Sequence, residues 1–258
     1  MLLGDLTLIE MLGLALAGFI GGGINAVAGG GSLITFPALL AVGYPAKVAN
    51  VTNTVALWPG YIGGSLGYRA LLFPQQRTIL VLTVSSVLGA IAGSAILLLT
   101  SEESFEAIVP FLILGAAILL AFQVRLGAFI ARLKRSVPVV GRVPLELHPA
   151  VFMLGLYGAY FGAGLGTLTL AVLSILLPDD LQRSNALKGM LSLIINAVAV
   201  VYFAFFGPVE WAPAAVMAVA GLAGGYYGVS IAKRLSASTL RMVVVGCSLI
   251  VAVILFVR

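Results

Sequence analysis

The chain has 258 residues, of which 61% are hydrophobic and only 9% are charged, and its formal net charge is +5. A soluble domain carries about 25% charged residues, so this chain cannot cover a water-facing surface and is predicted to be an integral membrane protein. The Lys and Arg residues cluster in a few short loops, as membrane topology demands, which argues against a nucleic-acid partner, and the single cysteine, Cys247, excludes a disulfide framework.

Apolar segments of helical length follow one another along the chain, in two sets separated by a basic stretch. The predicted fold is an all-α polytopic membrane protein with one membrane domain over 1–258, made of a first repeat (1–124), a basic cytoplasmic connector (125–148) and a second repeat (149–258). The expected segments are 7–28, 31–43, 48–67, 78–100 and 106–124, then 149–163, 165–177, 185–206, 212–232 and 238–257.

One glycine-rich cassette occurs twice in the sequence. The segment Ala28–Leu33, AGGGSL, recurs 135 residues later as Ala163–Leu168, AGLGTL, and Asn50 matches Asn185 at the same offset. Both cassettes interrupt apolar sequence, and a broken helix in lipid frees backbone groups that cost several kcal/mol each if they stay unsatisfied. Matched breaks in the two halves of a chain indicate a transport site.

The distribution of basic residues decides between two arrangements of the repeats. If each broken pair crosses the membrane once, the 14 Lys and Arg residues divide 8 to 6 between the two sides, with almost no bias. If each broken pair returns to its starting side, they divide 12 to 2. We therefore favour inverted repeats, each with a Gly-broken helix pair or re-entrant hairpin plus three spanning helices. The second pair is too short for two full spans, since each needs about 20 residues.

The glycine cassettes are the first candidate site. Glycine tolerates backbone conformations that other residues resist, and a helix that begins after a break points free N–H groups and a positive dipole end toward it. Two such helix starts would form an anion site. The alternative is that the glycines only permit close helix packing, and we prefer it for other glycines such as Gly89 and Gly93. The candidate residues are Gly29, Gly30, Gly31, Ser32, Gly164, Gly166 and Thr167.

Polar residues near the start of the third segment of each half are the second candidate. They are Asn50 and Asn53 in the first half and Asn185 and Lys188 in the second, and Asn53 aligns with Lys188. A lysine inside a membrane helix costs about 2.5–3.5 kcal/mol at mid-depth and marks a functional site by default. The alternative is that the polar residues cap their helices and that Lys188 extends to the interface. No carboxylate lies mid-span, and no metal-binding or nucleotide motif occurs, so no cofactor is predicted.

These residues resemble the TauE/SafE family of membrane permeases, which are sulfite or sulfonate exporters and related transporters. The similarity rests on Gly18–Gly23 followed by Ala28–Ile34, on Pro37 and Gly43, and on the helix start Ala49–Thr54. The stretch from Phe161 to Lys188 looks like the degenerate repeat of the family. The resemblance implies a multi-pass carrier in the cytoplasmic (inner) membrane of a prokaryote, with about eight spans by hydropathy, that moves small sulfur-containing anions.

The sequence thus predicts a secondary transporter, an exporter, of a small anion such as sulfite or a short organosulfonate or carboxylate. Its expected partners are this anionic substrate and membrane lipid, and a homo-oligomer is left open. One alternative is a non-transporting membrane assembly subunit, which gives no reason for the matched breaks. The other is an intramembrane enzyme, which the single histidine, the single cysteine and the lack of a mid-span acid disfavour. The substrate, the direction of transport and the coupling ion are not fixed by the sequence.

Overall fold

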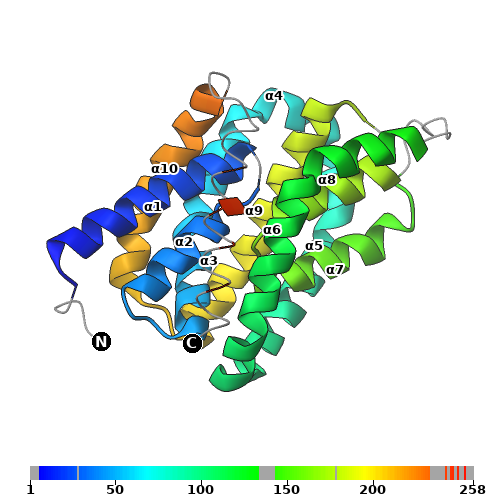
Figure 1. Ribbon diagram of the computed structural model, residues 1–258. Coiled ribbons are helices and arrows are strands. Elements are labelled where there is room, and N and C mark those ends of the chain that lie inside the picture. Colours follow the sequence, from blue (N-terminus) through cyan, green and yellow to red (C-terminus); the bar gives the residue numbers. More distant parts are fainter. Residues whose placement is uncertain are drawn as a thin grey trace.

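The computed structural model describes residues 6–27, 29–133, 143–177 and 179–232, together with residues 242, 245, 246, 249 and 253. This part of the chain is a bundle of helices joined by short turns (Figure 1). Apart from residues 242, 245, 246, 249 and 253, the expected segment 238–257 lies outside the described residues, as do residues 134–142 of the connector. Helix α6 continues through Leu133. The helices are α1 (Leu8–Val27), α2 (Ser32–Ala41), α3 (Ala46–Gly67), α4 (Arg69–Leu72), η1 (Phe73–Gln75), α5 (Gln76–Leu99), α6 (Glu102–Leu133), α7 (Leu147–Tyr160), α8 (Leu165–Leu176), α9 (Leu181–Phe206) and α10 (Trp211–Ala232).

Several helices have the length and composition of membrane spans, which confirms the predicted all-helical class. Within the described residues, four stretches qualify: Leu8–Ala26, Arg69–Leu99, Glu102–Phe122 and Gln182–Phe206. Helices α2 and α8, which follow the two glycine breaks, have only 10 and 12 residues. A helix of that length rises about 15–18 Å, whereas the hydrocarbon core is about 30 Å thick. Neither helix can therefore cross the membrane alone.

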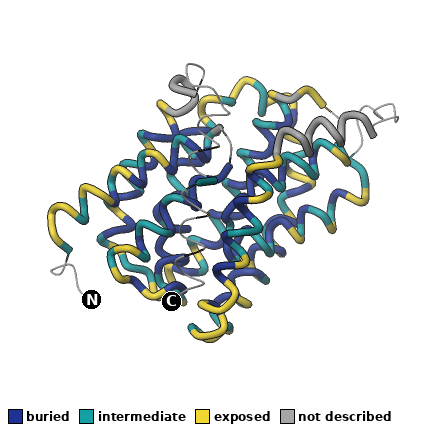
Figure 2. Tube along the Cα trace, viewed as in Figure 1, coloured by how far each residue is buried: buried dark blue, intermediate teal, exposed yellow. Residues whose placement is uncertain are grey.

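Many large apolar side chains are exposed on the outside of the bundle, where Figure 2 marks the exposed residues. Leu80, Val84 and Leu88 lie four residues apart on α5 and are 71%, 62% and 55% exposed, and Leu12 on α1 is 61% exposed. A soluble protein would not present such a continuous apolar face to water. These side chains are placed to contact lipid.

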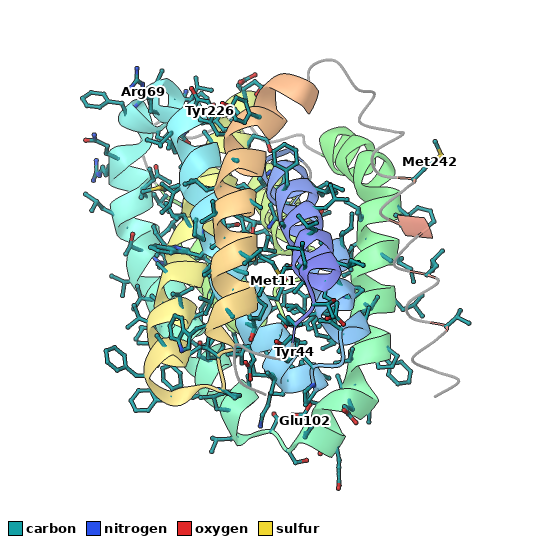
Figure 3. All side chains as sticks on the ribbon, turned by 90° about the vertical axis from the view of Figure 1, so that its left-hand side faces the viewer. Met11, Tyr44, Arg69, Glu102, Tyr226 and Met242 are labelled. Atoms are coloured by element: carbon teal, nitrogen blue, oxygen red, sulfur yellow. The ribbon has the colours of Figure 1, made fainter. Side chains whose placement is uncertain are left out.

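The helices run in alternating directions between two ends of the molecule (Figure 3). Arg69 and Tyr226 lie at one end, and Tyr44 and Glu102 lie at the other. Helix α3 therefore runs from the Tyr44 end to the Arg69 end, and α5 returns. Helix α10 ends near Tyr226, so it runs in the direction opposite to α5.

Helix packing follows a matched pattern across the two halves. Helix α1 packs along α10, as α5 packs along α7, and α3 contacts α10, as α9 contacts α5. Helices α3 and α9 begin 135 residues apart, and so do α5 and α10. Where α3 meets α9, the indole Nε1 of Trp58 donates a hydrogen bond to the carbonyl oxygen of Leu193, 135 residues further along, at 3.3 Å.

Small residues hold the closest helix pairs together. A Cβ on Gly18 of α1 would lie 2.7 Å from the carbonyl oxygen of Met217 on α10. A Cβ on Gly89 or Gly93 of α5 would overlap the backbone of α7 at Phe152 or Leu156. The packing role that the sequence predicts for Gly89 and Gly93 is thus confirmed.

Candidate functional site

The two glycine breaks meet in the interior of the molecule. The first lies between α1 and α2, where Gly29 has φ +80°, and the second lies between α7 and α8, where Gly164 has φ +74°. A Cβ on Gly29 would lie 2.6 Å from the Cα of Gly166, and a Cβ on Gly166 would lie 2.7 Å from the Cα of Gly29. The breaks of the two halves are therefore in direct backbone contact, which only glycine permits.

Other groups of the protein form hydrogen bonds to some of the backbone N–H groups that the first break leaves free. Gly31 donates its backbone N–H to Oδ1 of Asn25 at 2.7 Å, and the N–H groups of Leu33 and Ile34 bond to the carbonyls of Gly30 and Gly31 at 3.1 and 3.0 Å. Asn25 lies near the end of α1 and is 4% exposed. This asparagine was not selected as a site residue from the sequence, although a lone amide side chain in an apolar helix is a signal that the sequence shows.

The second break is stabilised in the same manner. The hydroxyl of Tyr157 donates to the carbonyl oxygen of Ala163 at 2.6 Å, and the N–H of Leu165 bonds to the carbonyl of Gly162 at 3.1 Å. Helix α6 covers both breaks from one side, because Leu120 lies against Gly30 and Ala116 lies against Gly164. Gly30, Gly31, Ser32, Gly164, Gly166 and Thr167 are all buried.

The polar residues of α3 are tied to both halves. Asn50 is 1% exposed, and its Nδ2 donates to the carbonyl oxygen of Tyr160 at the end of α7, at 2.9 Å. Asn53 is 1% exposed, and its Oδ1 accepts from the hydroxyl of Thr35 on α2. Thr35 also lies at 3.2 Å from the carbonyl oxygen of Gly31, so it links Asn53 to the first break. Its role was not foreseen.

The polar residues of α9 lack such partners. Lys188 is 3% exposed, and its Nζ has no hydrogen-bond partner among the described residues. The same holds for Oδ1 of Asn185 and for Oγ of Ser192, which follows Lys188 by one turn. No Asp or Glu among the described residues is buried. Lys188 therefore has no internal counter-charge in this part of the chain.

The two alternative interpretations of these polar residues are wrong. Helix α3 begins at Ala46 and α9 begins at Leu181, so Asn50 and Asn185 lie one turn inside their helices and do not cap them. The cap of α9 is Asp180, whose carboxylate accepts from the N–H groups of Gln182 and Arg183. Lys188 does not extend to an interface, because its side chain is buried.

Some of the candidate residues are in direct contact in the structure, whereas others are related only by contacts between the helices that carry them. Gly29 contacts Gly166, and Asn50 reaches the end of α7 beside the second break. Asn185 and Lys188 lie on α9, which contacts α8 after the second break. Among the described residues, neither Oδ1 of Asn185 nor Nζ of Lys188 forms a hydrogen bond to the glycines.

A helical bundle with apolar outer faces, two interrupted helix pairs and buried polar groups at the interruptions defines a polytopic membrane protein of the transporter class. Named relatives agree. The chain is 28% identical to a "Probable membrane transporter protein" of Haemophilus influenzae, over 88% of this chain and 87% of the relative. It is 27% identical to a "Probable membrane transporter protein ORF9" of Sinorhizobium sp, over 96% and 93%. It is 26% identical to the "Probable membrane transporter protein YfcA" of Escherichia coli K12, over 91% and 81%.

The sequence pattern of the sulfite exporter TauE/SafE family matches residues 14–255, and the chain belongs to this family. The predicted family membership is thus confirmed. The family and the names of its relatives indicate a membrane transporter and not an enzyme. A transporter of this family has a small-molecule substrate and a lipid environment.

Proposed function

We propose that this protein is a secondary transporter that carries a small anion, such as sulfite or a short sulfonate or carboxylate, across the cytoplasmic membrane of a prokaryote. The observation that supports an anion is the buried, unpartnered ammonium of Lys188. A buried charge without a partner costs several kcal/mol, and no buried carboxylate among the described residues offsets it. A bound anion supplies the missing charge. The description of the family as exporters favours export.

We further propose that the two halves are inverted repeats. The opposite directions of α5 and α10 and the matched helix starts support this relation. Two further hydrogen bonds start from matched positions, because Gln75 and Glu210 are 135 residues apart. Gln75 Nε2 donates to the carbonyl of Arg183 on α9, and the N–H of Glu210 bonds to Oγ1 of Thr52 on α3. Each bond joins the turn before one helix to the other half. Inverted repeats allow alternating access by movement of one group of helices against the other.

The proposed site lies beside the contact of the two breaks. Because Gly29 and Gly166 touch, an anion cannot lie between their α-carbons in this conformation. The substrate is instead held at the flanks, by Lys188 and the polar residues near it. The proposed binding residues are Gly29, Gly30, Gly31, Ser32, Asn50, Asn53, Gly164, Gly166, Thr167, Asn185 and Lys188.

The test of the site is anion flux into liposomes that contain the purified protein. Lys188→Met removes the charge and keeps most of the volume, whereas Lys188→Arg keeps the charge. Breaking a buried charge pair costs about 3–5 kcal/mol, so we expect Lys188→Met to lose at least about 100-fold in flux. The control is Arg183→Gln on the same helix, at a partly exposed position paired with Asp179 at 3.2 Å. Full flux in Lys188→Met would refute the site.

The test of the inverted repeats uses two exposed positions that match across the halves, Phe73 and Pro208. Single cysteines are placed there in a Cys247→Ser background and labelled with an impermeant thiol reagent. Inverted repeats place the two positions on opposite sides of the membrane, and parallel repeats place them on the same side. Labelling of both from one side would contradict the proposal.

A further inference from the structure

The residues that form the hydrogen bond from Asn50 to Tyr160 have counterparts in the other half of the sequence, but the structure shows no hydrogen bond between these counterparts. At the offset of 135 residues that relates the two halves, Asn50 corresponds to Asn185 and Tyr160 corresponds to Asn25. Asn50 lies one turn into α3 and reaches the end of α7. If the proposed repeat relation holds for this contact as well, Asn185 on α9 is expected to lie across from Asn25 near the end of α1. The residues that correspond to Asn50 and Tyr160 are thus two asparagines, Asn185 and Asn25.

Both asparagines carry a buried polar atom without a partner. These atoms are Nδ2 of Asn25 and Oδ1 of Asn185, so the two amides do not bond to each other. The orientation of the Asn25 amide is fixed, because its Oδ1 accepts the N–H of Gly31 at 2.7 Å and Nδ2 must face away. Buried amide groups without partners are rare in native proteins and require an explanation.

We propose that Asn25 and Asn185 bind the substrate between them, and that this substrate is a singly charged anion that carries a hydrogen-bond donor of its own. This inference rests on the proposed transport function and adds Asn25 to its site. A group placed between the two amides must accept from Nδ2 of Asn25 and donate to Oδ1 of Asn185.

The charge of the substrate follows from the neighbouring residues. Lys188 lies one turn after Asn185 on the same face of α9 and offers one positive charge. Among the side chains whose burial the structure describes, no other Lys or Arg is buried, so a dianion would keep one negative charge uncompensated. Ser192, one further turn along, adds a hydroxyl that donates or accepts. Hydroxy acids, hydroxy sulfonates and protonated oxyanions fit these requirements, and sulfate does not.

Two pairs of anions that differ by one hydroxyl test this inference. They are 2-hydroxyethanesulfonate against ethanesulfonate, and glycolate against acetate. Binding is measured as the ligand-dependent rise in the unfolding temperature of the purified full chain in detergent, since a ligand of the folded state stabilises it by mass action. We expect the hydroxylated member of each pair to bind about 10–100-fold more tightly, because its absence leaves a buried acceptor unsatisfied.

Variants locate the effect. Asn185→Leu removes the acceptor, so the two members of each pair should then bind about equally well. Asn185→Asp keeps an acceptor, so it should weaken the binding of both members but retain the preference for the hydroxylated anion. Asn25→Asp keeps the bond to Gly31 but replaces the donor with a negative charge, so it should abolish binding of all four anions. The control is Asn196→Leu on α9, because the Asn196 amide already donates to the carbonyl of Ser192 at 2.8 Å.

The outcomes separate this inference from the proposed function. Equal binding of both members of each pair to the wild type, or an unchanged preference in Asn185→Leu, would overturn the inference. The proposed function would still stand in that case, provided that the anions bind and that their binding depends on Lys188. If neither the four anions nor sulfite stabilises the wild type, the proposed function and the inference fall together.

Discussion

The contact between the two glycine breaks predicts a specific order of stability among glycine-to-alanine variants. A Cβ on Gly166 would lie 2.7 Å from the Cα of Gly29, so Gly166→Ala forces the two backbones apart. Overpacking of this kind costs about 1–3 kcal/mol. Gly29→Ala meets the same clash and must also hold alanine at φ +80°, which adds about 1–2 kcal/mol. We therefore expect a loss of about 2–5 kcal/mol for Gly29→Ala and about 1–3 kcal/mol for Gly166→Ala.

Two control variants separate the cost of the steric clash from the cost of holding alanine at a positive φ. Gly43 has φ +95°, and a Cβ added there would have no atom within 4 Å, so Gly43→Ala should show the backbone contribution alone, about 1–2 kcal/mol. Gly115 lies inside α6 with open space around it, so Gly115→Ala should be neutral or more stable by up to about 1 kcal/mol. Thermal unfolding of the purified variants in one detergent gives the order. A Gly166→Ala variant as stable as Gly115→Ala would refute the contact of the breaks.

Three further outcomes follow from single contacts. Lys47→Met should lower the unfolding free energy by about 1.5–3 kcal/mol in the same assay, because Nζ of Lys47 donates to the carbonyl oxygen of Thr100 at 2.6 Å near the end of α5. Gly93→Val should reduce the yield of folded protein on size-exclusion chromatography, since its Cβ would overlap α7, whereas Gly115→Val should not. Asn50→Leu should destabilise by about 1–3 kcal/mol, because it leaves the partly buried carbonyl of Tyr160 without this partner, and an unchanged unfolding temperature would contradict that bond.

The order and bounds of the helices could be predicted because the apolar pattern and the glycine breaks are both local signals. The expected segments 7–28 and 212–232 match α1 and α10 to within one residue at each end. The end of α6 was not foreseen, because Arg125 and Arg132 made residues 125–133 look like a connector, although charged residues also occur in helices that extend beyond the membrane.

The candidate site was predictable only in part. The repeat pointed to the glycines, to Asn50 and Asn185, and to Lys188, since each is visible as a matched or costly residue. Asn25 and Thr35 were missed because their counterparts, Tyr160 and Leu170, are different residue types. A repeat search finds what the halves share, whereas these two residues act by contacts that depend on how α1 and α2 fold back.

The differences between the halves account for the anion site that we propose in one of them. In the first half, Asn53 is neutral, and Thr35 on α2 satisfies it. At the matching positions the second half has Lys188 and Leu170, so the polar partner is lost and a charge is added. These changes add the unpartnered Nζ of Lys188 to α9, which also carries the unpartnered Oδ1 of Asn185 and Oγ of Ser192. In the site that we propose, a bound anion supplies the missing partner. The substrate preference should therefore change with residues of α9, and exchange of Lys188 for the asparagine of the first half should convert the site from an anion site to a neutral one.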